Sequence, residues 1–170
     1  IGSLTISKAG NLKAVLNETC EEEDEEVKSY IADIEANYEG EMGRKVGMSE
    51  VALVINDPET GERIVRNAET NAGDFCADAF RFVTGAEIAI VNGGGVRCDV
   101  PKGDLTYGDI ISLHPFANMV SVVEVSGQQI LDALEHGARY LPEENGGFLQ
   151  VSGMTYEIDM NVPSSVKLDE

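Results

Sequence analysis

Basic residues are scarce in this chain, because 12 Lys and Arg stand against 31 Asp and Glu, a formal net charge of −19. Nucleic acids and anionic membranes are bound through clustered positive charge, and an acidic protein repels their phosphates. The composition therefore argues against both classes of partner. A phosphorylated small molecule would have to be held by a few well-placed arginines or by an external cation.

Cysteine and histidine are also rare. Cys20, Cys76 and Cys98 have no C-x-x-C spacing, and an odd count argues against a complete disulfide framework; we expect Cys76 in the core. A metal-dependent hydrolase needs several converging His and carboxylate ligands, but the only histidines are His114 and His136. We interpret both as structural, and we expect no catalytic residue and no metal or other cofactor within these 170 residues.

Long apolar runs are missing too. No stretch approaches the roughly 20 apolar residues of a membrane helix, and no basic segment followed by an apolar one opens the chain. Ile1 starts directly in the alternating run "IGSLTI", without an initiator Met. We therefore interpret the chain as a fragment of a longer protein. With 42% apolar residues, it is long enough to bury the core of one domain.

The domain organisation is predicted from a change in composition along the chain. Residues 1–17 alternate like strands around a turn at 8–11, and indicate leading strands or the end of a preceding domain. Seven of the nine residues from Glu18 to Glu26 are acidic, which is most often a solvated face and favours a helix start. An apolar stripe then predicts a helix through about Tyr38, ended by Gly40 and Gly43. We assign 18–43 as an acidic connector helix with one face on a domain, and 44–170 as one domain.

Helices and strands are expected to mix within 44–170. This predicts an α+β fold with a mixed sheet packed against helices. The predicted elements are a strand from Lys45 through "SEVALVI", a turn at 58–61, a helix at 71–83 capped by Asn71 and Asp74, a strand at 87–91, a turn at 101–104, a helical turn at 107–113, a strand at 119–125, a helix capped by Ser126 and Gln129, and a hairpin of 148–151 with 154–159.

The candidate functional residues begin where the strand at 87–91 runs into Asn92-Gly93-Gly94-Gly95. Three glycines at a strand end can leave amides free to hold an anion or the edge of a base, although a tight turn without function is the plain alternative. Asn92 and Arg97 favour a ligand site, since an amide and a guanidinium fork flank the turn.

Phe116 is a second candidate, in the segment His114-Pro115-Phe116-Ala117-Asn118. A phenylalanine in such a loop is usually part of the core. If its ring is exposed, it offers a face on which a base can stack.

Four stretches together resemble the C-terminal domain of 5'-nucleotidases and their relatives, the UDP-sugar hydrolases and 2',3'-cyclic-nucleotide phosphodiesterases. They are "ETNAGDFCADAF", "GAEIAIVNGGGVRCDVPKGDLTYGDI", "HPFANMVSVVEVSGQQI" and "GGFLQVSGMTYEID". They cover about Arg66 to Asp159 in the family's order and spacing. Such ordered agreement is far more specific than a glycine motif.

The resemblance implies a domain that binds the nucleoside part of a nucleotide. Asn92 and Arg97 match polar contacts to base or ribose, Arg66 matches a second arginine, and Phe116 matches one ring of an aromatic clamp. Lesser contacts are implied for Gly94, Asn118 and Gly147. Two divalent metal ions and the catalytic residues are implied in a separate N-terminal domain of the same polypeptide.

The sequence also departs from the family's pattern. Ala117 stands where a glycine is common, and the family's closing segment, with the second clamp aromatic and an Asp in a Gly-Gly-Asp run, has no counterpart here. One-sided stacking contributes only about 1–3 kcal/mol per base. We therefore predict that this chain binds nucleosides weakly.

Three functions stay open on the sequence. The leading hypothesis is a secreted, periplasmic or cell-surface phosphoesterase of nucleotides, whose domains rotate about the connector. A non-catalytic nucleotide-binding or surface interaction module is the alternative, and intact metal ligands in the preceding domain would distinguish the two. The third is a phosphoesterase relative acting on another ester, such as a sulfate ester.

Overall fold

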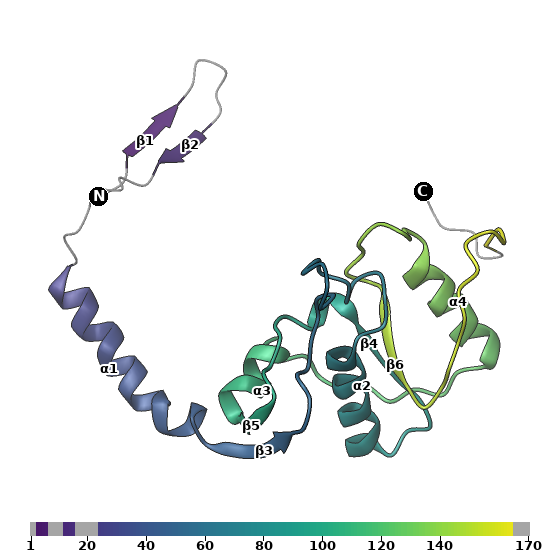
Figure 1. Ribbon diagram of the computed structural model, residues 1–170, viewed down its shortest axis with the longest axis horizontal. Helices are drawn as coiled ribbons and strands as arrows, with labels where there is room; N and C mark the ends of the chain where they lie inside the picture. Colours follow the sequence, from purple (N-terminus) through teal and green to yellow (C-terminus); the bar gives the residue numbers. More distant parts are fainter. Residues whose placement is uncertain (1–2, 7–11, 16–23, 165–170) are drawn as a thin grey trace. The chain divides into compact units, whose positions relative to one another are not determined.

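The computed structural model describes residues 3–6, 12–15 and 24–164 (Figure 1). The chain divides into two compact units, residues 1–41 and 42–170. Their division falls close to the predicted boundary between the connector and the domain that follows it.

The first unit contains a strand pair and a helix. Strand β1 (Ser3–Ile6) runs antiparallel to β2 (Leu12–Val15), with Ser3 opposite Val15; the predicted turn at 8–11 lies outside the described residues. Helix α1 spans Glu25–Met42. Asp24 caps it, because its Oδ1 accepts the amides of Glu26 and Val27 at 3.0 and 3.1 Å.

The predicted apolar stripe of α1 is present. Val27, Ile31 and Ile34 share one face and are 53%, 48% and 41% exposed. The helix passes the predicted end near Tyr38 and Gly40 and stops at Met42, directly before Gly43, the second glycine predicted to end it. A single glycine costs a helix only about 0.5–1 kcal/mol, which the hydrogen bonds of the neighbouring turns offset.

The second unit is an α+β arrangement, as predicted. Strand β3 (Lys45–Ser49) pairs antiparallel with β5 (Gly103–Thr106), and β4 (Ala89–Asn92) pairs antiparallel with β6 (Leu149–Ser152). Among the described residues, the expected mixed sheet is thus replaced by antiparallel pairs. Helices α2 (Asn71–Thr84), α3 (Tyr107–Leu113) and α4 (Gly127–Ala138) complete this unit (Figure 1).

Helix α2 lies where the sequence predicts it, but its cap is different. Thr70, not Asn71, is the N-cap residue, and its hydroxyl accepts the Gly73 amide at 3.1 Å. Asn71 instead bridges to the preceding loop, since its side chain accepts the Val54 amide and donates to the Ala52 carbonyl. Gly85 ends the helix in the left-handed conformation, at φ 68°.

Helices α3 and α4 are both fixed locally by capping boxes. Thr106 and Asp109 exchange side-chain and backbone hydrogen bonds at the start of α3, and Ser126 and Gln129 do so at the start of α4. The predicted helical turn at 107–113 and the predicted Ser126–Gln129 cap are therefore confirmed.

The core of the second unit lies between α2, β4 and the segments around them. Its buried apolar residues are Leu53, Ile55, Val65, Ala72, Cys76, Ala77, Val91, Val96, Val100, Leu105 and Leu113.

Gln150 is a polar residue buried beside this core, and it is 1% exposed. Its Oε1 accepts the Thr70 amide at 3.0 Å, and its Nε2 donates to the carbonyls of Val65 and Ala68 at 3.0 and 2.7 Å. β6 is thereby tied to the turn that precedes α2.

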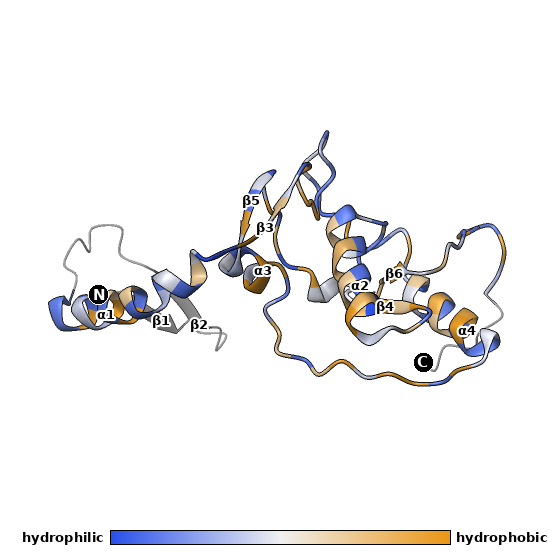
Figure 2. Ribbon diagram, turned by 90° about the horizontal axis from the view of Figure 1, so that it is seen from below, coloured by the Kyte–Doolittle hydropathy of each residue, from blue (hydrophilic) through white to orange (hydrophobic). Residues whose placement is uncertain are grey.

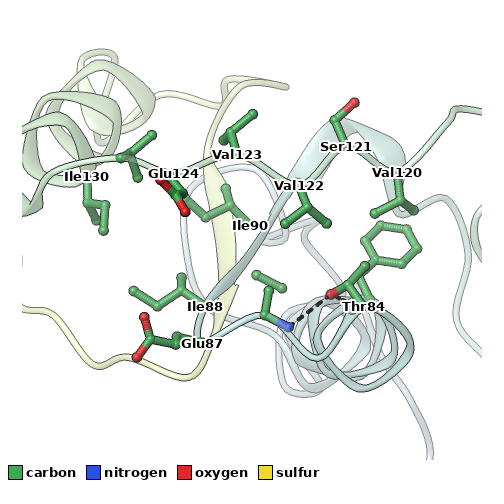
Figure 3. Close-up of a pocket in the computed structure, with 14 residues that line it drawn as sticks. Thr84, Glu87, Ile88, Ile90, Val120, Ser121, Val122, Val123, Glu124 and Ile130 are labelled. Atoms are coloured by element: carbon green, nitrogen blue, oxygen red, sulfur yellow. Dashed lines mark hydrogen bonds between the residues drawn. The ribbon is translucent and has the colours of Figure 1, made fainter.

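The predicted strand at 119–125 is wrong. These residues are exposed and pair with no strand among the described residues. Figure 2 shows the connection between α3 and α4 as an extended ribbon coloured mostly as hydrophobic. These residues face β4 across a hollow of about 610 Å³, with Val120 to Val125 on one side and Glu87 to Ile90 on the other (Figure 3). β-branched residues favour a strand, but a strand needs a hydrogen-bonding neighbour.

Two other strand predictions are also corrected. β3 ends at Ser49, and "SEVALVI" contributes beyond it only isolated bridges, such as Leu53 with Val100. The predicted hairpin partner at 154–159 is not a strand. Its Tyr156 hydroxyl instead donates to the Leu149 carbonyl at 3.0 Å, so a side chain holds this segment against β6.

Candidate functional site

The glycine turn lies at the end of β4, where Gly93–Gly95 form one 3-10 turn. The Gly93 amide donates to the Phe148 carbonyl at 2.7 Å, and the Gly94 amide donates to the Gly146 carbonyl at 2.9 Å. The hypothesis that these amides are free to hold an anion is therefore wrong for two of the three. Their hydrogen bonds attach the turn to the loop before β6.

Close packing explains why these positions are glycine. A Cβ on Gly93 would collide with the Val65 carbonyl oxygen, and one on Gly94 would lie 3.0 Å from the Gly146 Cα. Both distances are too short for an ordinary side chain. The turn is thus packed between two backbone segments, and it presents Asn92 and Arg97 at its two ends.

Arg97 lies over the ring of Phe116. Its Cζ is 5.8 Å from the ring centre, within the range of a cation–π contact, and its Nη1 donates to the Gly94 carbonyl at 3.2 Å. Its backbone amide donates to Leu113 at 2.9 Å. Phe116 is 48% exposed, so the ring is not a core residue and keeps surface for a planar ligand.

Three further predicted residues form hydrogen bonds within the loop before β6 or within the loop that carries Phe116. Asn92 donates from Nδ2 to the Gly146 carbonyl at 3.2 Å, which turns the amide towards the same loop. Gly147 follows in that loop, and its amide donates to the Asn145 side chain at 3.0 Å. Asn118 closes a tight turn, because its amide donates to the Phe116 carbonyl at 2.6 Å.

Arg66 reaches the same loop through its backbone, since its carbonyl accepts the Asn145 amide at 2.9 Å. The Arg66 Nε is buried and has no hydrogen-bond partner. The neighbouring Glu144 is paired with Arg63 at 2.6 Å. The hydrogen bond from Arg63, and then the charges of Arg63 and Arg66, lower the pKa of Glu144, so Glu144 stays ionised beside both arginines.

Asn145 is a residue that the sequence reasoning missed. It contacts three segments, because its amide donates to Arg66, its Oδ1 accepts from Gly147 and its Nδ2 donates to the Gly137 carbonyl at 3.3 Å. The signal in the sequence was an Asn directly before two glycines. Such a residue is typical of a side chain that fixes its own loop.

The hollow beside β4 is a separate feature, and no predicted site residue lines it. Apolar side chains form most of its walls, and its charged groups are Glu87 and Glu124 (Figure 3). A phosphorylated ligand would be repelled there. The chemistry of the side chains therefore favours the surface at Arg97 and Phe116 over the larger hollow.

Residues 24–164 offer neither a cluster of metal ligands nor a membrane-spanning helix. In this range no three His, Cys, Asp or Glu side chains gather in a way that could hold a metal ion. The residues present thus do not fit the metal centre that a phosphoesterase requires. The helices of this range are too short or too polar to cross a bilayer.

Residues 45–170 match the family described as the 5'-nucleotidase C-terminal domain. This match covers most of the chain. The chain belongs to this family. The features that carry the resemblance, from the glycine turn to Phe116, lie within the matched residues, and the structure places them on one unit.

Relatives of this 5'-nucleotidase C-terminal domain are longer proteins. The trifunctional nucleotide phosphoesterase protein YfkN of Bacillus subtilis is 38% identical over 82% of this chain, which spans 10% of that protein. The cell wall protein Lmo0130 of Listeria monocytogenes is 28% identical over 77% of the chain, or 18% of that protein. The crystal structure of a 5'-nucleotidase precursor from Thermus thermophilus matches with a TM-score of 0.71 and 30% identity, covering 94% of this chain and 32% of that one.

Proposed function

We propose that this domain recognises the nucleoside part of nucleotides for a 5'-nucleotidase-type phosphoesterase. The observation that carries the proposal is Arg97 above a half-exposed Phe116 ring, beside Asn92 and the glycine turn. Phe116 supplies a stacking face for the base, and Arg97 supplies a planar cation with several donors. Asn92 adds an amide that can donate and accept at once.

The arrangement also accounts for binding of a negatively charged ligand by an acidic domain. The net charge of −19 opposes the approach of a nucleotide, so attraction must be local. Arg97 and Arg66 provide that local charge, and Asn118 and Gly147 provide lesser contacts. Stacking on the Phe116 ring alone contributes about 1–3 kcal/mol per base, so binding through this ring is expected to be weak.

Hydrolysis belongs to a separate metal-binding domain of the longer polypeptide in this proposal. Two divalent ions there would polarise the phosphate ester and activate water, and this domain would position the substrate. Residues 18–43 would connect the two domains. A location outside the cytoplasm, either periplasmic, extracellular or at the cell surface, is supported by the relative named a cell wall protein.

The test is a calorimetric or NMR titration of adenosine and AMP into the chain. Weak binding that is lost in Arg97→Ala supports the proposal. Failure of the wild-type chain to bind either compound, repeated with the full-length protein, would contradict it. A submicromolar complex would contradict the predicted weakness of one-sided stacking.

A matched control is present in the same chain. Arg139 lies with its Cζ 4.6 Å from the centre of the Tyr140 ring, and Tyr140 is 56% exposed. This pair repeats the chemistry of Arg97 and Phe116 on two residues that follow α4 and that do not flank the glycine turn. Arg139→Ala should therefore leave adenosine binding unchanged.

A further inference from the structure

The imidazole of His114 lies between helix α2 and the glycine turn. Its ring meets Phe80 edge-on, with ring centres 5.5 Å apart and planes at 87°. On the other side, a Cβ placed on Gly95 would lie 3.0 Å from the His114 Nε2. His114 thus occupies the space on the Cβ side of Gly95, and its ring lies between this glycine and Phe80 of α2.

The neighbours of His114 connect it to both halves of the candidate site. The residue before it, Leu113, accepts the Arg97 amide at 2.9 Å, and Phe116 follows two residues later. Arg97 in turn donates to the Gly94 carbonyl, next to the glycine that His114 supports. A shift of the imidazole would therefore move the turn, Arg97 and the Phe116 loop relative to one another.

We propose that His114 is a positioning residue that sets the geometry of the Arg97–Phe116 pair through its contact with Gly95. The proposal rests on the nucleoside-binding function proposed above for its effect on ligand, but the contact itself can be tested without ligand. The φ of Gly95 is not in the left-handed region. An added Cβ there would come nearest to the His114 Nε2, at 3.0 Å, and would also meet the Asn92 Oδ1 at 3.4 Å. An alanine there meets the His114 ring without first straining the backbone.

The experiment is a double-mutant cycle of Gly95→Ala and His114→Ala. Its two readouts are the affinity for AMP and the ligand-free NMR signal of the Arg97 Nε–H group. In the wild-type background, Gly95→Ala should shift the Arg97 signal and weaken AMP binding about fivefold or more, because the added methyl group crowds His114 and the packed turn must move to accommodate it. In the His114→Ala background, the same substitution should change the AMP affinity by less than about twofold and should leave the Arg97 signal nearly unshifted.

Two further variants separate positioning from general destabilisation. Gly108→Ala is the control, since its Cβ would lie 3.1 Å from the Met42 carbonyl oxygen; it creates similar crowding at the first turn of α3, the opposite end of that helix from His114, and should leave the Arg97 signal unchanged. His114→Ala should weaken AMP binding. His114→Gln, whose side chain keeps a polar group at a similar distance from the backbone, should weaken it less.

The outcomes are distinguishable. Equal effects of Gly95→Ala in both backgrounds, or an equal loss in Gly108→Ala, would overturn the role of His114. Coupling between positions 95 and 114 in the ligand-free signal, without AMP binding by any form, would support positioning by His114 and overturn the proposed function instead.

Discussion

Arg97 and Phe116 are joined by a contact of 5.8 Å between the guanidinium carbon and the ring centre, although they lie on different segments. Arg97 follows the glycine turn, and Phe116 lies in the loop after α3. Their contact defines the surface to which we assign nucleoside recognition. It also leads to the first two predictions.

Phe116→Leu should weaken adenosine binding about 5- to 150-fold, because a leucine keeps apolar volume but loses the face on which a base stacks. Ribose 5-phosphate, which has no base, should bind the two proteins equally. Calorimetry with both compounds measures this difference. Tyr140→Leu is the control, and a similar loss there would argue against a specific stacking site.

Arg97→Lys should weaken adenosine binding about 2- to 30-fold, the range of one cation–π contact. Lysine keeps the charge but not the planar fork that reaches both the ring and the Gly94 carbonyl. Arg139→Lys, titrated with adenosine in the same way, is the control for effects that replacing any arginine by lysine would have on the affinity. Unchanged affinity in Arg97→Lys would show that only charge matters at this position.

Gln150→Leu should lower the free energy of unfolding by about 2–5 kcal/mol, because the Thr70 amide and the carbonyls of Val65 and Ala68 would lose buried partners. Urea unfolding followed by circular dichroism measures the loss. Gln128→Leu is the matched control, since the Gln128 side chain is exposed and bonds only to Asp132 at 2.8 Å. Equal midpoints for both variants would contradict the role of Gln150.

Asp74→Asn should stabilise the domain at neutral pH. Burial, and then the charges of Glu69 and Asp78, raise the pKa of Asp74 from 3.8 to about 6 in the folded protein. The folded state therefore holds this proton more tightly, and stability falls as the pH rises from about 4 through 6. The gain in Tm should be small at pH 4 and full at pH 7. A gain that is equal at both pH values would contradict this titration.

We predict that the chain self-associates through the exposed segment 119–125 and that Val122→Lys reduces this association. Val122 is 65% exposed in an extended segment that pairs with no strand among the described residues. Unpaired backbone groups of such a segment can form hydrogen bonds with another chain. The net charge opposes association at low salt, so the effect should be clearest at about 0.5 M salt, where charges are screened. Sedimentation velocity measures the oligomers, with Val51→Lys, also at an exposed position, as the control.

The sequence by itself determined the helices, the glycine turn and the family. Helices α2, α3 and α4 are correctly located because their hydrogen bonds and caps are formed by residues close in sequence. The apolar stripes and the Ser126–Gln129 box are local signals of the same kind. The α+β class follows from the same elements.

Only the tertiary structure decided which extended segments become strands and what the site residues touch. Met119–Val125 has every local feature of a strand, but strand formation depends on a partner that local sequence does not specify. The sequence left open whether the glycine amides are free or part of a tight turn, and the carbonyls of Phe148 and Gly146 accept two of them. The contacts of Arg97 with Phe116 and of His114 with Gly95 likewise join distant segments, so their geometry is set by packing of the whole domain.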